Sequence, residues 1–459
     1  MGTKEAAGLR EGFAGALIEP GDDGYDDART IFNSMIDRHP AVIAQCESAD
    51  DVAAALAHAR ERDLEVAIRS GGHSVAGASS VERGLVVDMR RMNAVEIDPD
   101  ARIARVAGGA TWGDFDRAGQ PHGLMTTGGR VSTTGVAGLT LGGGSTWFER
   151  KYGAASDHLV SVALVTADGR RVTASETENP ELFWALHGGG GNFGVATELV
   201  FRLSPLATVT LAMLLWPADA GPELARRYRE LVEDGAPEEL GGGFGYITGP
   251  PEEFVPDHLR DRLVAAVIGF YAGGEAEARE VLAPILELGP EAEMIAELPY
   301  AEAQSAIDDP PGYRNYWSAA YLAELPDEAL AAFCRRADDM VVPSPSQHVL
   351  FPLGGALARQ AGEWPMPYRQ APWAVHPLGL WEDPGDDERA IAWARNTVED
   401  AQPHAIEGVY LNFIPDEGED RVMAGYGREN YDRLAKVKAE YDPDSVFHLH
   451  HNIRPVQAA

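Results

Sequence analysis

The sequence contains few of the residues that support disulfide bonds, zinc binding or phosphate-loop chemistry. Cysteine occurs only twice in 459 residues, at Cys46 and Cys334, which excludes a disulfide framework and a zinc-ligand pattern. Only four of the 38 basic residues are lysines, against 72 acidic residues. A nucleotide loop ending in GK[ST] is absent, and no GxGxxG motif opens a helix. The two cysteines therefore predict buried thiols in a reducing compartment.

A formal charge of −34 limits the partners that the protein can bind. Such a field repels phosphate backbones and anionic lipids, so we expect neither a nucleic-acid partner nor a membrane partner. The first residues lack the basic and apolar regions of a signal peptide, and no apolar run is long enough to span a bilayer. We therefore expect a soluble, cytoplasmic protein. The excess of carboxylates agrees equally with adaptation to high salt and with a genomic composition bias.

Hydrophobic patterns divide the chain into three parts. In residues 1–205, short apolar runs predict strands that alternate with glycine clusters, and residues 50–62 predict an amphipathic helix. In residues 206–405 the glycine clusters become rare, and longer strands alternate with helices, which predicts a second α+β domain. Residues 406–459 predict a strand over 408–413 followed by two helices.

Three glycine clusters in the first part indicate a ligand that is bound close to the backbone. They are Arg69-Ser70-Gly71-Gly72-His73-Ser74, the Gly-, Ser- and Thr-rich run over 128–144, and residues 188–194. Glycines let the backbone approach a ligand, and successive amide groups can hold a phosphate. One such cluster alone indicates an ordinary tight turn. Three of them predict one extended ligand, and a dinucleotide fits that requirement.

Three motifs together resemble one family of flavoproteins. They are IRSGGHSVAG at 68–77, GGGGNFGVAT at 188–197 and YDPDSVFHLHHNIRP at 441–455, in the family's order. The chain is thus similar to the berberine bridge enzyme-like FAD-linked oxidoreductases of the vanillyl-alcohol oxidase and p-cresol methylhydroxylase fold group. The resemblance implies an α+β fold with three parts: a p-cresol methylhydroxylase-type FAD-binding domain over 1–205, an α+β substrate domain over 206–405, and a segment over 406–459 that returns to the FAD domain.

The resemblance also implies which residues hold the cofactor. In the family, the histidine of the RSGGHS loop bonds covalently to the 8α-methyl group of the flavin, and His73 stands at that position. Many relatives add a second bond from a cysteine, and because Val131 takes its place here, we expect a single covalent link. The other implied contacts are Arg69, Ser70, Gly71, Gly72 and Ser74 at the pyrophosphate, Thr133, Gly135, Gly138 and Thr140 along the cofactor, Val195 at the adenine end, and Tyr410 and Asn412 beside the flavin.

Two residues are candidates for proton transfer at the flavin. A flavin accepts a hydride at N5, and oxidation of an alcohol also requires a base for the hydroxyl proton. Several relatives use the second tyrosine of a Y-x-N-Y segment as that base, and Phe413 replaces it here, which leaves Tyr410 either as the base or as a packed aromatic residue. His376 stands where relatives place a substrate-facing side chain. Histidine titrates near neutrality, although a lone histidine is more often structural.

Together, the residues and the resemblance predict an oxidoreductase with covalent FAD that takes a hydride from a small alcohol, sugar or secondary metabolite. Gly129 stands where relatives control oxygen access, and its small size predicts reoxidation by O2. Two alternatives remain open: an amine oxidase of the same fold that needs no base, and a flavin-binding protein without turnover. His448, His450 and His451 indicate a tail that packs on the cofactor rather than a metal site, so we expect no metal.

Overall fold

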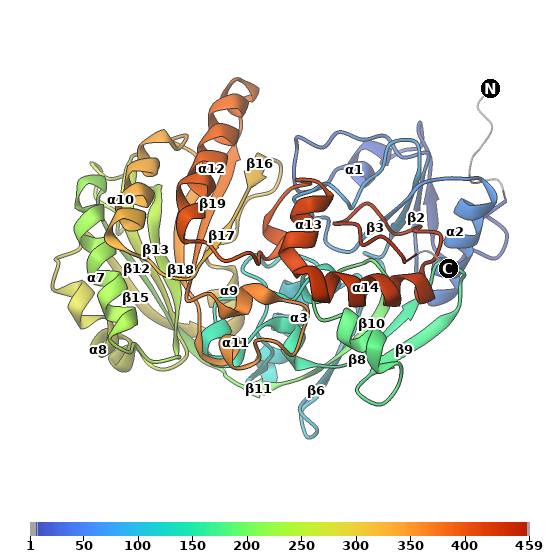
Figure 1. The fold of residues 1–459 in the computed structure, drawn as a ribbon, viewed down its shortest axis with the longest axis horizontal. Coiled ribbons are helices and arrows are strands. Elements are labelled where there is room, and N and C mark those ends of the chain that lie inside the picture. Colours follow the sequence, from blue (N-terminus) through green and yellow to red (C-terminus); the bar gives the residue numbers. More distant parts are fainter. Residues whose placement is uncertain (1–5, 7, 457–459) are drawn as a thin grey trace.

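The computed structural model describes residue 6 and residues 8–456, and it combines helices with three main sheets, as the α+β prediction requires. Figure 1 shows two lobes side by side. One lobe contains the first two sheets, and the other contains the third sheet with its covering helices.

The first sheet consists of Ala16–Ile18 (β1), Val42–Gln45 (β2), Val66–Arg69 (β3) and Leu85–Asp88 (β4). Its order is β1-β2-β4-β3, and the last three strands run parallel. Helix α2 (Ala49–Glu61) covers one face through an apolar stripe that includes Val52 and Leu56. Ser48 begins this helix, because its side chain accepts a hydrogen bond from the N–H group of Asp51 at 3.2 Å. The helix predicted over 50–62 is therefore confirmed.

The second sheet is antiparallel and consists of Val95–Asp98 (β5), Ile103–Ala107 (β6), Leu159–Val165 (β8), Arg171–Ser175 (β9) and Val195–Arg202 (β10). Strand β10 lies in its centre, between β6 and β8. Leu124–Met125 (β7) and Ser204–Pro205 (β11) form a separate pair. The helices of this region are Trp112–Gly119 (α3), Val136–Leu141 (α4), Glu149–Tyr152 (α5) and Pro180–Ala185 (α6).

The third sheet is antiparallel and consists of Thr208–Pro217 (β12), Leu240–Thr248 (β13), Leu263–Tyr271 (β14), Ala292–Pro299 (β15), Arg314–Trp317 (β16), Ala320–Leu322 (β17), Gln347–Pro352 (β18) and Trp373–Trp381 (β19). One face is covered by Gly221–Glu233 (α7), Glu275–Leu286 (α8), Asp327–Arg336 (α10) and Asp387–Ala401 (α12) (Figure 1). The short helices Tyr300–Ser305 (α9) and Gly355–Arg359 (α11) lie near the other lobe. Because side chains alternate along a strand, Leu350 packs under the helices and Val349 belongs to the core on the opposite face.

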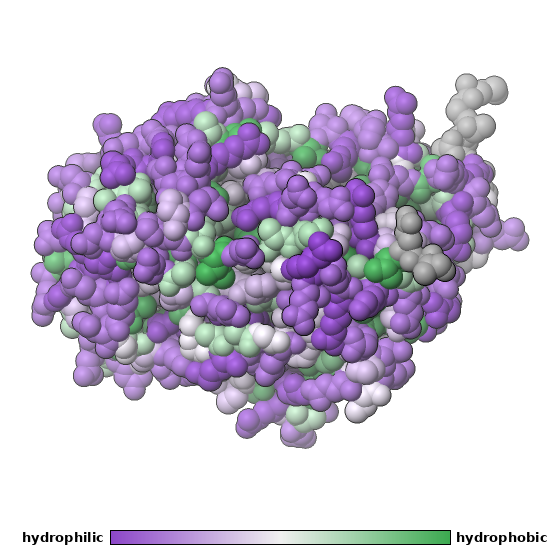
Figure 2. Space-filling model, in the orientation of Figure 1, coloured by the Kyte–Doolittle hydropathy of each residue, from purple (hydrophilic) through white to green (hydrophobic). Residues whose placement is uncertain are grey.

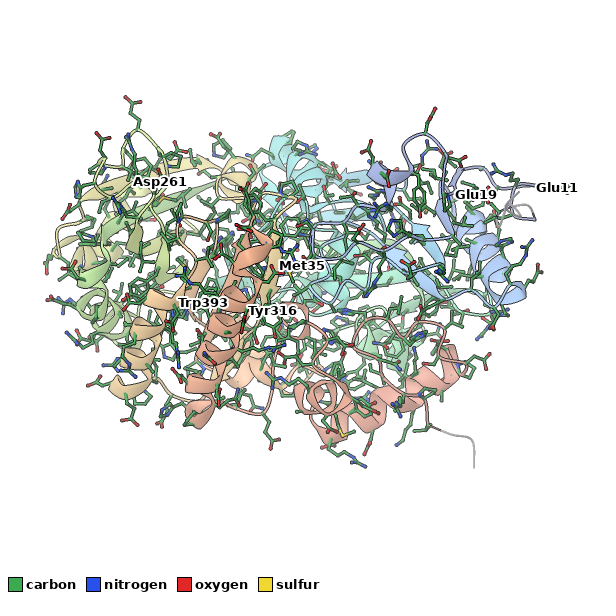
Figure 3. All side chains as sticks on the ribbon, turned by 90° about the horizontal axis from the view of Figure 1, so that it is seen from above. Glu11, Glu19, Met35, Asp261, Tyr316 and Trp393 are labelled. Carbon is green, nitrogen blue, oxygen red and sulfur yellow. The ribbon has the colours of Figure 1, made fainter. Side chains whose placement is uncertain are left out.

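A loop after α1 (Tyr25–Arg29) joins the two lobes. Asn33 Nδ2 donates a hydrogen bond to the carbonyl of Asn315 at 3.1 Å, and the N–H group of Asn315 donates to Asn33 Oδ1 at 3.3 Å. Met35 of the same loop packs on a buried cluster that contains Trp381. Figure 3 shows Met35 at this junction, close to Tyr316 of β16. The loop is thus fixed between the lobes.

The structure differs from the sequence prediction at two elements. The strand predicted over 408–413 is wrong, because Tyr410 is extended without a strand partner among the described residues and Leu411–Phe413 form a 3₁₀ turn. Its apolar pattern reflects burial between the lobes rather than pairing. Strand β13 was not predicted, because glycines at 241–243 are unusual in a strand. Here Gly241 is required, since an added Cβ would lie 1.8 Å from the carbonyl oxygen of Trp147.

The C-terminal tail returns from the third sheet to the first lobe through α13 (Glu419–Tyr426) and α14 (Arg428–Tyr441) (Figure 1). Lys438 of α14 is fully buried. Its Nζ donates hydrogen bonds to Asp442 Oδ2 at 2.6 Å and to the carbonyl oxygens of Asn192 and Phe447, each at 2.7 Å. A buried ammonium group is tolerated only with such acceptors. Lys438 therefore fastens the tail to the third glycine cluster.

Hydrophilic side chains dominate the face of the molecule seen in Figure 2, in agreement with the large acidic excess. Within the part of the chain that the structure describes, no helix combines the length and apolar character that a membrane crossing requires.

We expect Lys438→Met to destabilise the protein strongly. The substitution leaves the carboxylate of Asp442 buried without its counter-ion, and removal of one partner from a buried pair costs about 3–5 kcal/mol. Urea unfolding followed by tryptophan fluorescence measures this loss. Lys436→Met is the matched control, because Lys436 is exposed two residues earlier on the same helix. Equal unfolding midpoints for the two variants would contradict the assigned role of Lys438.

Candidate active site

A cavity lies where the three sheets meet, and its free volume, including the open mouth, is about 1730 Å³. Ile68 lines it from the first sheet, Ala196 from the second, and Phe351 and Leu378 from the third. One end of the cavity is formed by the glycine clusters and the other by aromatic side chains. The cavity wall therefore combines a glycine-rich part with an aromatic part.

Two glycine clusters interlock at the wall of this cavity. An added Cβ at Gly71 would lie 2.2 Å from the backbone nitrogen of Gly135, and one at Gly135 would lie 2.3 Å from the nitrogen of Gly71. Such distances are far below van der Waals contact, so neither position accepts a side chain. The absence of both side chains brings the loop after β3 against the loop before α4. This contact decides where His73 lies.

The His73 ring is held on three sides. Its Nε2 lies 2.8 Å from Thr133 Oγ1, and its Nδ1 lies 3.4 Å from Thr134 Oγ1. The ring of Phe32, from the loop between the lobes, stacks on it at a centroid distance of 4.1 Å. Burial and, to a smaller extent, the charge of Arg69 lower the pKa of His73 to about 4. The imidazole is therefore neutral at physiological pH and half-buried, and it lines the cavity.

The structure brings most of the predicted site residues together. Those that line the cavity are Ser70, Gly71, Gly72, His73, Ser74, Gly135, Gly138, His376, Tyr410 and Asn412. Thr133 does not line it but holds His73, as described above. Thr140 is fully buried, and Val195 lies in the core of the first sheet.

Arg69 differs most from its predicted role at a pyrophosphate. Its guanidinium turns away from the cavity, where Nη1 donates to the carbonyl of Ala28 at 2.6 Å and Nη2 donates to that of Thr30. These carbonyls belong to the segment that carries Phe32. Arg69 therefore supports the ring that stacks on His73.

Gly129 also lies outside the cavity lining. An added Cβ there would meet Leu139 Cδ1 at 2.7 Å and Trp112 Cδ1 at 3.0 Å. The position requires glycine because of this packing, so its small size gives no reason to expect an oxygen path at Gly129.

The glycine-rich end fits a phosphate-containing cofactor. The backbone N–H groups of residues 70–74 donate no hydrogen bond to any residue that the structure describes, although they border the cavity. Adjacent free N–H groups form an anion-binding surface without any cationic side chain. At Gly138 and Gly191, which also line the cavity, an added Cβ would enter open space. Both features are expected where a cofactor runs along the backbone.

The C-terminal tail completes this end of the cavity. His450 lines it, and burial lowers the pKa of this residue to about 3. His451 is buried as well, whereas His448 Nε2 lies 3.0 Å from Glu65 Oε1 at the surface. The His448 ring therefore lies apart from the other two rings, whose centroids are 4.6 Å from each other. Within the described residues, no group of three His, Cys, Asp or Glu side chains converges as a metal site requires.

At the aromatic end, Arg130 lies over the ring of Phe351, with Cζ 3.8 Å from the ring centroid. Its Nη2 donates to Glu149 Oε1 at 3.2 Å and to the carbonyl of Thr146 at 3.1 Å. The Nε and Nη1 groups are buried without an acceptor in the described chain. Because a guanidinium keeps its charge in proteins, these two donors are available to oxygen atoms of a ligand in the cavity. No sequence motif had marked Arg130.

The two predicted proton-transfer residues are both neutral at physiological pH. Burial lowers the pKa of His376 to about 3. Its Nδ1 lies 2.9 Å from the carbonyl of Ser318, which can only accept, so we assign the proton to Nδ1 and leave Nε2 as a buried acceptor without a partner in the described chain. Burial raises the pKa of Tyr410 to about 12, although a hydrogen bond from Asn412 Nδ2 at 3.0 Å opposes the shift. Neither residue is a titrating base near pH 7.

Comparisons with known proteins show which family the chain belongs to. A family model described as an FAD binding domain matches residues 40–175, and one described as berberine and berberine like matches residues 409–454. The (R)-6-hydroxynicotine oxidase of Paenarthrobacter nicotinovorans is 32% identical over 457 residues, which cover 96% of this chain and 97% of that protein. The chain belongs to the berberine bridge enzyme-like FAD-linked oxidoreductases.

Two further comparisons agree with this assignment. The FAD-linked oxidoreductase YgaK of Bacillus subtilis (strain 168) is 29% identical over 460 residues, covering 96% of this chain and 97% of its own. The crystal structure of 6-hydroxy-D-nicotine oxidase from Arthrobacter nicotinovorans superposes with a TM-score of 0.84 at 28% identity, covering 97% of this chain and 98% of that chain. They confirm the predicted family, the p-cresol methylhydroxylase-type FAD-binding fold and an FAD-linked oxidoreductase activity.

Gly138→Ala and Gly135→Ala test how this oxidoreductase holds FAD. Alanine at 138 meets no protein atom, and glycine-to-alanine in a helix gains about 1 kcal/mol, so the apoprotein should be at least as stable. Its methyl group enters the cavity, however, and FAD content should fall several-fold. Alanine at 135 forces the interlocked loops apart and should lower both stability and FAD content. Thermal unfolding measures stability, and the ratio of flavin to protein absorbance measures FAD content. Normal FAD content in Gly138→Ala would contradict a cofactor cradle, meaning a binding surface formed by the glycine clusters that line the cavity.

Proposed function

We propose that this enzyme holds FAD through one covalent bond to His73, oxidises a small organic substrate by hydride transfer to flavin N5, and is reoxidised by O2. The observation that carries the proposal is the His73 ring, which is neutral and fixed at the wall of the cavity beside the glycine cradle. The candidate substrates are an alcohol, a sugar or a secondary metabolite.

The state of His73 supports covalent attachment. A new bond from the imidazole to the flavin methyl carbon requires a ring nitrogen with a free lone pair, and a neutral imidazole supplies it at every pH above its lowered pKa. Phe32 and Thr133 hold the ring in one place, which reduces the entropy lost on bonding. Val131 lines the cavity where a second, cysteine-derived link stands in relatives, and its side chain cannot form one.

An amine oxidase of the same fold is the second candidate function. Hydride loss from a neutral amine needs no base, and the neutral states of His376 and Tyr410, together with Phe413 at the place of the family's tyrosine base, agree with such a reaction. The similarity to a 6-hydroxynicotine oxidase also supports it. A protein that binds flavin without turnover is the third possibility, which the screen below addresses.

His73→Ala should release the flavin. After acid precipitation the wild-type pellet stays yellow, whereas the His73→Ala pellet is colourless and its intact mass lacks the FAD addition. His376→Ala is the matched control, since it removes another buried ring of the same cavity and should keep the flavin bound. A yellow His73→Ala pellet, or loss of colour in both variants, contradicts attachment at His73.

Anaerobic mixing with alcohols, sugars and 6-hydroxynicotine tests turnover. A substrate bleaches the oxidised flavin band, because the hydride reduces the ring. Admitting air should restore the band and release one equivalent of hydrogen peroxide if O2 is the acceptor. Restoration only by an artificial acceptor contradicts the oxidase part of the proposal, and a band that no compound bleaches contradicts turnover itself.

A further inference from the structure

A buried aspartate borders the cavity at the third sheet and belongs to no motif of the family resemblance. Asp309 lies in the loop between α9 and β16, and its residue surface is 7% exposed. It lines the same cavity as His73 and His376. Among the described residues it has one hydrogen-bond donor, Gln347 Nε2, at 2.7 Å from Oδ1. The second oxygen, Oδ2, accepts no hydrogen bond from the described chain, and this oxygen is available to a ligand.

Gln347 holds the carboxylate on the face of the sheet that points to the cavity. It is the first residue of β18, and Val349 and Phe351 follow on the same face at alternate positions. In the pairing of β18 with β19, Gln347 lies opposite Leu378, and Val349 lies opposite His376. The amide of Gln347 is therefore one step along the sheet from the His376 ring. The pairing of β18 with β19 fixes the position of the Gln347 side-chain amide, and the hydrogen bond from this amide fixes the Asp309 carboxylate.

The next residue in the chain has a different partner. Asp308 Oδ1 accepts a hydrogen bond from the N–H group of Ser132 at 2.7 Å, and Oδ2 accepts one from the Ser132 hydroxyl group. Ser132 directly follows Val131, which lines the cavity. Asp308 therefore anchors the loop on the wall beside the cofactor cradle, and this anchor places Asp309 at the cavity.

We propose that Asp309 accepts the proton of a substrate hydroxyl group while the adjacent carbon loses its hydride, and that the substrate is therefore an alcohol rather than an amine. The C–H hydrogen leaves with both bonding electrons to flavin N5, and the O–H proton moves to Asp309 Oδ2. The alcohol carbon becomes a carbonyl, and the flavin gains two electrons, which it later passes to its acceptor. This inference rests on the proposed function, since it requires flavin reduction by a substrate.

Electrostatics support this assignment. Burial and, to a smaller extent, the neighbouring charge of Asp308 raise the pKa of Asp309 to about 7, against the opposing effect of the hydrogen bond from Gln347. A base works best when its pKa is near the working pH. The other titratable groups that line the cavity are Arg130 and Tyr410 at its aromatic end, His376 from β19, and His73 and His450 at the cofactor end.

The other groups of the cavity are less suitable proton acceptors. His376 has a strongly lowered pKa, so its Nε2 can accept a hydrogen bond but does not hold a second proton on the ring near pH 7. Tyr410 keeps its proton well above neutral pH. Arg130 only donates. Asp309 is thus the group that can both orient the hydroxyl group and take its proton.

Stopped-flow reduction of the flavin by an alcohol or sugar that bleaches it in the anaerobic screen tests the role of Asp309. In the wild type the rate should rise with pH as the carboxyl group loses its proton near pH 7. Asp309→Asn should slow reduction by about 100-fold or more and abolish that rise. Gln347→Leu should shift the rise to higher pH, because it removes the hydrogen bond that favours the carboxylate. A wild-type rate and pH profile in Asp309→Asn overturns the proposal.

Asp116→Asn is the matched control. Asp116 is also a buried aspartate whose pKa is raised by burial, but it does not line the cavity. This variant should keep the wild-type rate and pH profile. If Asp116→Asn changes them as Asp309→Asn does, the effect belongs to buried aspartates in general and the proposal is overturned.

Infrared titration of the oxidised holoprotein gives a readout that needs no substrate. A protonated-carboxyl signal that titrates with a midpoint near pH 7 should be present in the wild type and in Asp116→Asn and missing in Asp309→Asn. Any signal of the Asp116 carboxyl group itself should be missing only in Asp116→Asn. Absence of the signal with a midpoint near pH 7 from the wild type overturns the assigned protonation state. If that signal is present but no alcohol or sugar reduces the flavin while 6-hydroxynicotine does, the alcohol assignment alone fails. If no compound reduces it, the proposed function fails.

Discussion

The close approach of Gly71 and Gly135 is the constraint on which the site depends. Two backbones meet at a distance that any side chain would prevent, and this places His73 between Thr133, Thr134 and Phe32. Residues 70–74 line the cavity, and their N–H groups donate no hydrogen bond to the described chain. The contact between Gly71 and Gly135 thus fixes the His73 ring and also forms an anion-binding surface.

Burial, rather than ion pairing, controls the charges around the cavity. It lowers the pKa of His73 and His376 and raises that of Tyr410, so these side chains are neutral at physiological pH. Arg130 keeps its charge, and Glu149 accepts a hydrogen bond from only one of its guanidinium nitrogens. A dry wall with few fixed charges strengthens each remaining polar contact, because the local dielectric is low. Arg130 and His376 keep polar atoms without a partner in the described chain, and these atoms are available to a cofactor or substrate in the cavity.

The sequence predicted that the glycine clusters border a ligand site and that His73 lies there. These features depend on local backbone requirements and on an ordered set of motifs. It did not predict that Arg69 turns towards Ala28 and Thr30, since that contact depends on a loop about 40 positions away in the chain. The sequence did not mark Asp309 as a site residue for the same reason. Its position depends on a hydrogen bond from Gln347, which is distant in the chain and belongs to β18. The apolar pattern at 408–413 was misread as a strand because burial between lobes produces the same sequence signal.

Side chains alternate along β18 and β19, so that one set packs against the helices and the other set faces the cavity. Leu350 and Val375 pack against the helices, while Gln347, Phe351, His376 and Leu378 face the cavity from alternate positions of the same strands. Substitution of a cavity-facing residue therefore changes the substrate surface without removing a contact from the helical layer. The cofactor cradle is built on other strands and on the tail. This division allows the cavity-facing residues of the third sheet to vary without a change in the glycine-rich wall.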